Sequence, residues 1–298
     1  MSNPAANSDA RISGQIVAAF GRSYLVATAG GLVSCVPRGK RSDYACGDIV
    51  GLKETGDREG VIESIQPRSS LLLRSAAHRQ KLIAANVTQV AIIVAAEPSF
   101  SDELIARVQV AAENAGIDSF IVLNKSDLLK EAALALQRLQ PFSRAGYPPL
   151  LLSARVDPEP VRARLLGNVT VLVGQSGMGK STLVNALIPG TDAATREIST
   201  FLASGKHTTT HARIYRMDTI STIVDCPGLQ EFGLAHLNWR EIAYGFREFR
   251  PFLGNCRFPD CRHLSEPGCS ISAAVESGAI AARRQELYRR IVSAERAA

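Results

Sequence analysis

The residues GQSGMGKS, at positions 174–181, match the pattern G-x-x-x-x-G-K-[ST] of a phosphate-binding loop. They follow an apolar run and precede a helical stretch, TLVNALI, which is the strand–loop–helix setting that the motif requires. The glycines let the backbone curl so that its N–H groups point at phosphate oxygens, and the helix N-terminus adds partial positive charge. Lys180 would reach the β- and γ-phosphates of a nucleotide, and Ser181 would bind Mg²⁺. The predicted phosphate site comprises Gly174, Gln175, Ser176, Gly177, Met178, Gly179, Lys180, Ser181 and Thr182.

A second motif, VDCPG (224–228), ends an apolar run with the pattern D-x-x-G. On a strand that follows a phosphate loop, this pattern is a candidate magnesium-sensing switch. Asp225 would hold Mg²⁺ through water, and the Gly228 N–H would contact the γ-phosphate. Between the two motifs lies GKHTTTH (205–211), from which a threonine could complete the magnesium shell when the γ-phosphate is present. An exposed polar loop is the alternative interpretation of that segment.

The tetrapeptide NKSD (124–127) follows another apolar run, IDSFIVL. A carboxylate at Asp127 can accept both N–H protons of guanine, whereas adenine offers no such pair. Asn124 and Lys125 would connect the purine to the phosphate loop, and LSA (152–154) could supply a backbone N–H to the guanine carbonyl. The predicted base site comprises Asn124, Lys125, Ser126, Asp127, Ser153 and Ala154. If NKSD were only a polar strand end, an ATP-dependent phosphate-loop enzyme would be the alternative.

These motifs come in a rotated order, because the base-reading tetrapeptide precedes the phosphate loop along the chain. A parallel sheet tolerates such an order if the original termini lie close together and new ends open in a loop. The ligand site is built in space at the carboxyl ends of the strands, and it does not depend on which strand comes first.

Three cysteines and one histidine form a second cluster, Cys256-x₄-Cys261-x-His263-x₅-Cys269. Three thiolates and one imidazole make a closed tetrahedral set, which is typical of structural rather than catalytic zinc. The other cysteines, Cys35, Cys46 and Cys226, have no matching partners and are expected to be packing or surface thiols.

Apolar patterning predicts the elements that position these motifs. Five short runs between residues 14 and 65, separated by Gly and polar turns, predict a small barrel, for which an OB-fold is one candidate. The stretch PRSSLLLR (67–74) is expected to be a linker. Continuous apolar runs then alternate with helical stretches, which predicts a parallel sheet covered on both faces. These runs are VTQVAIIVAA (87–96), IDSFIVL (117–123), PPLLLSA (148–154) and NVTVLVG (168–174).

Helix and hairpin signals complete the pattern. Ser101 is placed to cap a helix and Gly116 to end it. ARIYRM (212–217) and TISTIVD (219–225) are joined too tightly for a helix between them, which predicts a hairpin. LNWREIAYGFREF and IAARRQELYRRIVSAE are both predicted to be helical. The second of these carries Arg283, Arg284, Arg289 and Arg290, which could face RNA phosphates or water.

The chain has 298 residues and a formal net charge of +6, which permits a nucleic-acid partner without requiring one. No apolar run approaches the roughly 20 residues of a membrane span. The start, MSNPAANSDARIS, lacks the features of a signal peptide and is expected to be a short disordered tail. We therefore expect a cytoplasmic protein, with a monomer as the default.

The order NKSD, LSA, GQSGMGKS, HTTT, DCPG resembles that of the circularly permuted GTPases. Together with the possible OB barrel, the strings HTTTHARIY, DCPGLQEFGL and NCRFPDCRHLSEPGC closely resemble the ribosome small-subunit-dependent GTPase A family (RsgA, also called YjeQ). The resemblance extends over nearly the whole chain, from about residue 12 to residue 294.

The resemblance implies a multidomain protein with a tail (1–12), an OB-fold barrel (13–68), a circularly permuted P-loop GTPase domain (69–232) and a small, mostly helical zinc-binding domain (233–298). It implies Mg²⁺ with GTP, one structural zinc per chain, and GTP hydrolysis stimulated by the small ribosomal subunit. Such a protein would act late in maturation of that subunit, bind its rRNA and be released on hydrolysis. An RNA-binding assembly protein that only senses GTP, with negligible turnover, is the alternative.

The catalytic assignment also depends on this resemblance. Leu229 stands where many GTPases place a water-orienting Gln after D-x-x-G. The family likewise lacks that Gln, and a switch histidine is thought to replace it. His207 matches that histidine, with His211 as the competitor, and Thr209 would be the magnesium-sensing threonine, with Thr208 as a close rival.

Overall fold

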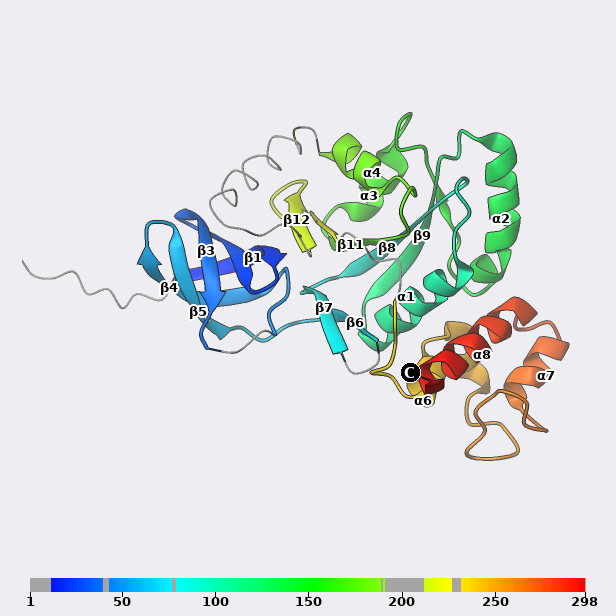
Figure 1. Ribbon diagram of the computed structural model, residues 1–298. Coiled ribbons are helices and arrows are strands. Elements are labelled where there is room, and N and C mark those ends of the chain that lie inside the picture. Colours follow the sequence, from blue (N-terminus) through cyan, green and yellow to red (C-terminus); the bar gives the residue numbers. More distant parts are fainter. Residues whose placement is uncertain are drawn as a thin grey trace, which may run out of the picture.

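The computed structural model has three parts, with an α/β unit between an OB-like barrel and a smaller, mostly helical C-terminal module (Figure 1). It describes residues 12–39, 43–76, 79–188, 190, 212–226 and 232–297. None of the helices in these ranges combines the length and apolar character of a membrane span.

The five predicted N-terminal strands form the barrel. They are β1 (Ile12–Phe20), β2 (Ser23–Thr28), β3 (Gly31–Pro37), β4 (Ile49–Gly56) and β5 (Glu59–Ile65). Antiparallel pairing of β1 with β4, in addition to β2, closes the sheet on itself. Ile16, Val26, Val50, Leu52 and Ile62 are fully buried inside it. Alternating apolar residues thus fill a small closed barrel, which confirms the prediction.

The expected linker at 67–74 is wrong in its second half. Leu71–Ala76 is a strand, β6, and it pairs antiparallel with β7 (Arg79–Ala85). Leu72 and Ile83 bury their side chains in the core shared with the α/β unit. A strand of only six residues has too few alternations to stand out from a polar linker.

The α/β unit contains the predicted parallel sheet. Its strands are β8 (Gln89–Ala95), β9 (Asp118–Asn124), β10 (Leu150–Leu151), β11 (Val169–Val173) and β13 (Thr222–Asp225). They lie in the order β10-β9-β8-β11-β13, followed by β12 (Ala212–Arg216), which pairs antiparallel with β13 and confirms the predicted hairpin. All seven residues of β8 are buried, as expected of a strand covered on both faces.

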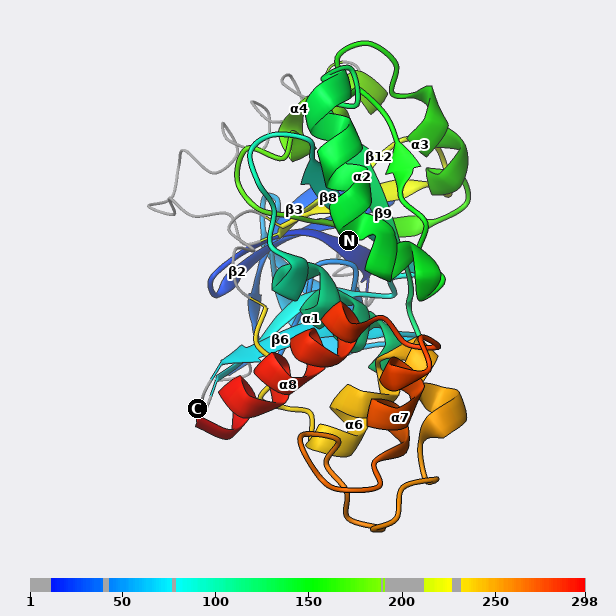
Figure 2. The ribbon, with the colours of Figure 1, turned by 90° about the vertical axis from the view of Figure 1, so that its right-hand side faces the viewer.

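In the described residues these strands are accompanied by the helices α1 (Asp102–Asn114), α2 (Leu129–Arg144), α3 (Glu159–Leu165) and α4 (Lys180–Leu187). Figures 1 and 2 show α1 on one side of the sheet and α3 and α4 on the other. The predicted cap is present, since the Ser101 hydroxyl accepts a hydrogen bond from the Leu104 N–H at 3.2 Å. Gly116 follows α1 with a positive φ of 66°.

The sheet does not stop at the α/β unit. Strand β12 pairs antiparallel with β1 of the barrel, with Ala18 opposite Arg213 and Ala19 opposite Ala212. The 11 strands therefore form one continuous sheet across both parts.

The C-terminal module contains α6 (Trp239–Tyr244), a 3₁₀ helix (Arg247–Phe252), α7 (Ser270–Glu276) and α8 (Ala282–Ala297). The single helix expected over LNWREIAYGFREF is divided at Gly245. A Cβ at this position would lie 2.9 Å from the Val110 Cα of α1, so only glycine allows the module to approach α1 this closely.

Arginines of the module hold it against α1 and α2. Arg284 is 1% exposed and donates to a Glu248 oxygen at 2.5 Å and to Gln109 Oε1 at 3.0 Å. Its guanidinium also lies 4.8 Å from the Phe142 ring centroid and 4.7 Å from that of Phe246. Arg283 pairs with Asp102 at 2.7 Å. Of the arginines whose direction the sequence left open, Arg284 is therefore buried and Arg283 reaches the α/β unit with about a third of its side chain still exposed.

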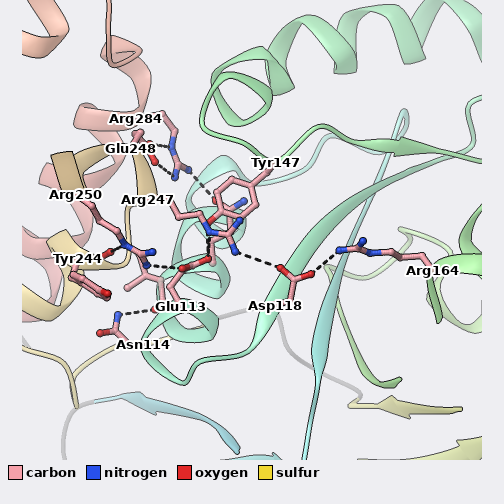
Figure 3. A network of polar contacts seen from close by, with 12 residues as sticks. Glu113, Asn114, Asp118, Tyr147, Arg164, Tyr244, Arg247, Glu248, Arg250 and Arg284 are labelled. Carbon is pink, nitrogen blue, oxygen red and sulfur yellow. Dashed lines mark hydrogen bonds and ion pairs between the residues drawn. The ribbon is translucent and has the colours of Figure 1, made fainter. Parts of the chain in front are cut away.

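A second polar network crosses the same interface (Figure 3). Glu113, at the end of α1, accepts hydrogen bonds from Arg250 at 2.6 Å and from the Tyr147 hydroxyl at 2.9 Å, and it also pairs with Arg247. The Glu113 side chain is only 7% exposed, so these ion pairs are partly desolvated. The module is therefore joined to α1 by buried charges as well as by apolar packing.

Candidate functional site

A cleft of about 590 Å³ opens at the carboxyl ends of β9, β10 and β11. This is the edge at which ligands bind in open α/β sheets. The cleft brings three sequence motifs together although they lie far apart in the chain. It is lined by Asn124, Lys125, Asp127, Leu128, Ser153, Ala154, Arg155, Ser176, Gly177, Gly179, Lys180, Ser181 and Thr182.

Two glycines of the phosphate-binding loop occupy positions that no other residue could take. A Cβ on Gly174 would lie 2.3 Å from the Ile93 carbonyl oxygen of the neighbouring strand. Gly179 has a φ of +88°, and its Cβ would lie 2.3 Å from Asn124 Nδ2. Helix α4 begins at the next residue, so the loop delivers its backbone N–H groups at a helix N-terminus.

Asn124 is a hub between the three motifs and is 1% exposed. Its Nδ2 donates to the Met178 carbonyl oxygen of the phosphate-binding loop at 2.9 Å. Its Oδ1 accepts from the backbone N–H groups of Lys125 at 2.8 Å and Ala154 at 2.9 Å. One side chain thus fixes the base-reading loop, the SA turn and the phosphate-binding loop relative to one another.

Lys180 and Asp225 lie on the phosphate side. Lys180 Nζ donates to the carbonyl oxygens of Gly174 at 2.5 Å and Gln175 at 2.9 Å. Burial lowers the pKa of Lys180, while the Asp225 carboxylate opposes that shift. Burial likewise raises the pKa of Asp225, and Lys180 opposes that rise. Within the described part of the chain, Asp225 Oδ1 is buried without a hydrogen-bond partner, which fits a carboxylate that serves a hydrated cation.

Four residues of the predicted base and phosphate sites, like Asp225 of the predicted magnesium site, lie around the cleft rather than in its wall. Gln175 Oε1 accepts from the Ser101 N–H at 2.7 Å, so its side chain points to the start of α1. The Met178 side chain is 1% exposed in the core, and only its carbonyl serves the motif. Gly174 lies beneath the loop, and Ser126 uses its backbone N–H on the Leu152 carbonyl at 3.1 Å.

The cleft also contains residues that the sequence reasoning missed. Arg155 and Leu128 are part of its wall, although neither belongs to a recognised motif. Each directly follows one, LSA or NKSD, and this adjacency was the available signal. The predictions made for the switch segments lie outside the described residues, since they concern His207, His211, Thr208, Thr209, Gly228 and Leu229.

The Cys/His cluster forms a second site, in the C-terminal module. The ligand atoms of Cys256, Cys261, His263 and Cys269 all lie within 4.8 Å of one another. His263 Nδ1 is 3.4 Å from the Sγ atoms of Cys256 and Cys269 and 3.6 Å from that of Cys261. The four residues could therefore hold one metal ion in a tetrahedral site.

Aromatic packing orients the histidine of this cluster. The His263 ring centroid lies 6.2 Å from those of both Trp239 and Tyr288. The Tyr288 hydroxyl in turn donates to the Arg262 carbonyl at 2.7 Å. The ligand loop is thus fixed to α6 on one side and to α8 on the other.

Comparison with known proteins agrees with this arrangement. A family model described as RsgA GTPase matches residues 65–235. The small ribosomal subunit biogenesis GTPase RsgA of Nitrosospira multiformis is 52% identical over 283 residues, which cover 95% of this chain and 90% of the relative.

Two solved structures have the same architecture. YjeQ from Thermotoga maritima superposes with a TM-score of 0.72 at 30% identity and covers 95% of this chain and 98% of its own. YloQ, described as a circularly permuted GTPase, gives a TM-score of 0.69 at 23% identity, covers 99% of this chain and 98% of its own, and shows likeness of fold. The expected architecture of an OB-like barrel, a permuted GTPase unit and a cysteine–histidine module is confirmed, and the chain belongs to the RsgA GTPase family.

Proposed function

We propose that this chain hydrolyses GTP to GDP and phosphate as a late maturation factor of the small ribosomal subunit. The observation that carries the proposal is the single cleft in which base-reading, phosphate-binding and SA motifs meet around Asn124. The relative named a small ribosomal subunit biogenesis GTPase supports the biological setting. We place this activity in the cytoplasm, and we propose a division into domains at 13–68, 69–232 and 233–298.

We propose that Asp127 recognises the guanine base. Its side chain is exposed and lines the cleft, where a carboxylate can accept the two N–H groups that guanine presents. If this is right, Asp127→Asn lowers the affinity for GDP and raises that for xanthosine diphosphate, whose base carries an oxygen where guanine carries an amine. Retained GDP affinity in this variant, measured by calorimetry, would remove Asp127 from base reading.

For magnesium we propose Ser181, Thr209 and Asp225 as the residues that hold it directly or through water. The unpartnered Asp225 oxygen and the position of Ser181 in the cleft support two of them. When bound, Mg²⁺ neutralises charge on the transferred phosphoryl group. Lys180 binds the phosphates, the Gly228 N–H contacts the γ-phosphate, and His207 orients the attacking water.

For the cysteine–histidine cluster we propose a structural zinc. Bonds of about 2.3 Å to sulfur and about 2.0–2.1 Å to nitrogen, at tetrahedral angles, separate S from N by about 3.6 Å. The observed separations of 3.4 to 3.6 Å fit that geometry. A closed set of four protein ligands leaves no position for a substrate, so the ion would shape the module and not react.

Coupling to the ribosome is tested by measuring GTP hydrolysis with purified small subunits, with large subunits and with neither. We expect stimulation by small subunits alone and release of the protein as GTP is consumed. Undetectable turnover in all three arms would contradict the enzymatic proposal and favour a GTP sensor that binds rRNA.

A further inference from the structure

A cleft in the C-terminal module, of about 460 Å³, is separate from the nucleotide cleft and borders the cysteine–histidine cluster, since Cys256, Cys261 and His263 line one side of it. It lies between α6 and the loop that carries the first metal ligands. Its wall includes Trp239, Tyr244, Leu253, Phe258 and Pro259. Tyr244 is 51% exposed and Phe258 is 40% exposed, so two large aromatic rings are open to solvent at one opening.

An arginine guanidinium lies near each of the Trp239, Tyr244 and Phe258 rings. The guanidinium of Arg240 lies 4.4 Å from the Trp239 ring centroid, and that of Arg257 lies 5.5 Å from the Phe258 centroid. A third, that of Arg250, lies 4.2 Å from the Tyr244 centroid. Within the described part of the chain, Arg240 and Arg257 form no ion pair, so their charges are available to a partner.

The polar groups of the wall are also informative. Asn114 and Glu241 place an amide and a carboxylate beside the aromatic rings. The Asn114 Nδ2 donates to the carbonyl oxygens of Val110 at 2.8 Å and Glu241 at 3.0 Å, and the Glu241 Oε2 accepts from the Asn238 N–H at 2.7 Å. Figure 3 shows Asn114 and Tyr244 near one another at the end of α1. The Asn114 Oδ1 and the second Glu241 carboxylate oxygen can still accept hydrogen bonds from the amino group of an unstacked base.

We propose that this cleft binds an unpaired RNA base, which stacks on its exposed aromatic rings while Arg240 and Arg257 contact the flanking phosphates. The proposal rests on the proposed ribosomal function and gives it a residue-level RNA contact. Flat rings beside unpaired guanidinium groups match the combination of π-faces and phosphates that single strands present.

Charge complementarity favours RNA over an apolar peptide. From residue 232 to 297 the sequence contains ten arginines and seven acidic residues, a net charge of +3. At the cleft itself, Arg240 and Arg257 outnumber Glu241, the acidic residue of the wall, and Glu113 at the adjoining interface is paired with Arg250, so the charge left at the cleft mouth is positive. An apolar segment would have to cover these guanidinium groups without neutralising them.

Trp239 makes a direct test possible because it is the only tryptophan of the chain. The full-length protein, loaded with zinc and GDP, is titrated with a short single-stranded oligoadenylate RNA, with an abasic strand of the same length and with the corresponding duplex. We expect the oligoadenylate to quench Trp239 fluorescence and the abasic strand and duplex not to do so. Equal quenching by the abasic strand would show a phosphate contact only and would overturn the proposal.

Variants locate the contact. Removing a stacking ring, in Tyr244→Ala or Phe258→Ala, is expected to weaken RNA binding roughly 5- to 140-fold, which corresponds to about 1–3 kcal/mol per stacked base. Affinity is measured by the anisotropy of labelled RNA, so that it does not depend on Trp239. Arg290→Ala is the matched control, because Arg290 is an exposed arginine of the same module outside the cleft, and it should bind RNA nearly as the wild type does.

Two further outcomes would overturn the inference. Wild-type RNA affinity in both aromatic variants would place RNA elsewhere. Normal RNA affinity together with lost binding to purified small subunits would make a ribosomal protein the occupant. GTP hydrolysis by the wild type and the same variants is measured alongside RNA affinity, so that the two proposals are tested separately. Guanine-specific turnover by the wild type would support the GTPase function whether or not this cleft binds a base.

Discussion

The side chain of Asn124 offers a sharp test of how the nucleotide cleft is held together. Asn124→Ala removes three hydrogen bonds and leaves the Met178 carbonyl and the N–H groups of Lys125 and Ala154 without their partner. In the empty protein these loops can relax until water reaches the freed groups. With nucleotide bound, the loops are brought back together and at least one freed group is desolvated.

The magnitude follows from that desolvation. An unsatisfied buried polar group costs about 1–3 kcal/mol. If nucleotide binding buries one of the three groups, the dissociation constant for GDP should rise roughly 5- to 140-fold. Calorimetric titration of GDP, with unfolding curves of the empty protein recorded alongside, separates lost affinity from lost stability.

Asn168 provides the matched control. Its side chain also takes part in three hydrogen bonds, since Oδ1 accepts from Thr88 Oγ1 at 2.8 Å and Nδ2 donates to the carbonyl oxygens of Leu166 at 3.0 Å and Arg164 at 3.4 Å. However, Asn168 lies at the opposite end of the sheet. We expect Asn168→Ala to lower stability and leave GDP affinity within about twofold of the wild type. Two results would refute the proposed role of Asn124 in holding the cleft together. One is unchanged GDP affinity in Asn124→Ala, and the other is an equal loss of GDP affinity in Asn168→Ala.

Three further changes have expected outcomes. Arg284→Met leaves the largely buried Glu248 carboxylate without its partner and should lower the free energy of unfolding in urea by about 3–5 kcal/mol. Arg290→Met removes an exposed ion pair and should lower that free energy by less than about 1 kcal/mol. Similar losses in the two variants would contradict a stabilising role of the buried ion pair. His207→Ala should reduce subunit-stimulated hydrolysis in single-turnover assays while GDP affinity is kept, and unchanged turnover would remove this residue from the mechanism. Chelation of zinc should shift Trp239 emission, because the Trp239 ring lies 6.2 Å from that of His263. It should also lower the melting temperature, because metal binding stabilises the folded module. An unaltered melting curve, together with no bound zinc by elemental analysis, would rule out a structural ion.

The nucleotide cleft was largely predictable because its residues are dense in local signals. Gly174 and Gly179 are in the motif because a Cβ would collide with a neighbouring strand or side chain, and sequence patterns record such constraints directly. The metal cluster was predictable for a similar reason, since cysteine and histidine at short spacings have few other uses.

What sequence reasoning missed depends on contacts between distant segments. The C-terminal helix has a run of arginines that suggests a solvated or RNA-facing surface, yet Arg284 is buried because Gln109 and Glu248 happen to face it. The division of the predicted helix at Gly245 has the same cause, since it reflects the approach of α1. No property of the local sequence reveals such partners.

The pairing of β1 with β12 has a consequence for any shortened form of the protein. A fragment cut at the predicted boundary between barrel and GTPase domain would keep β12 but lose the strand that satisfies its outer backbone groups. The opposite border of the sheet is blunted by β10, which is only two residues long. The barrel therefore also covers the β12 edge and prevents edge-to-edge association of two sheets. A GTPase fragment without the barrel should self-associate even if its nucleotide cleft is intact.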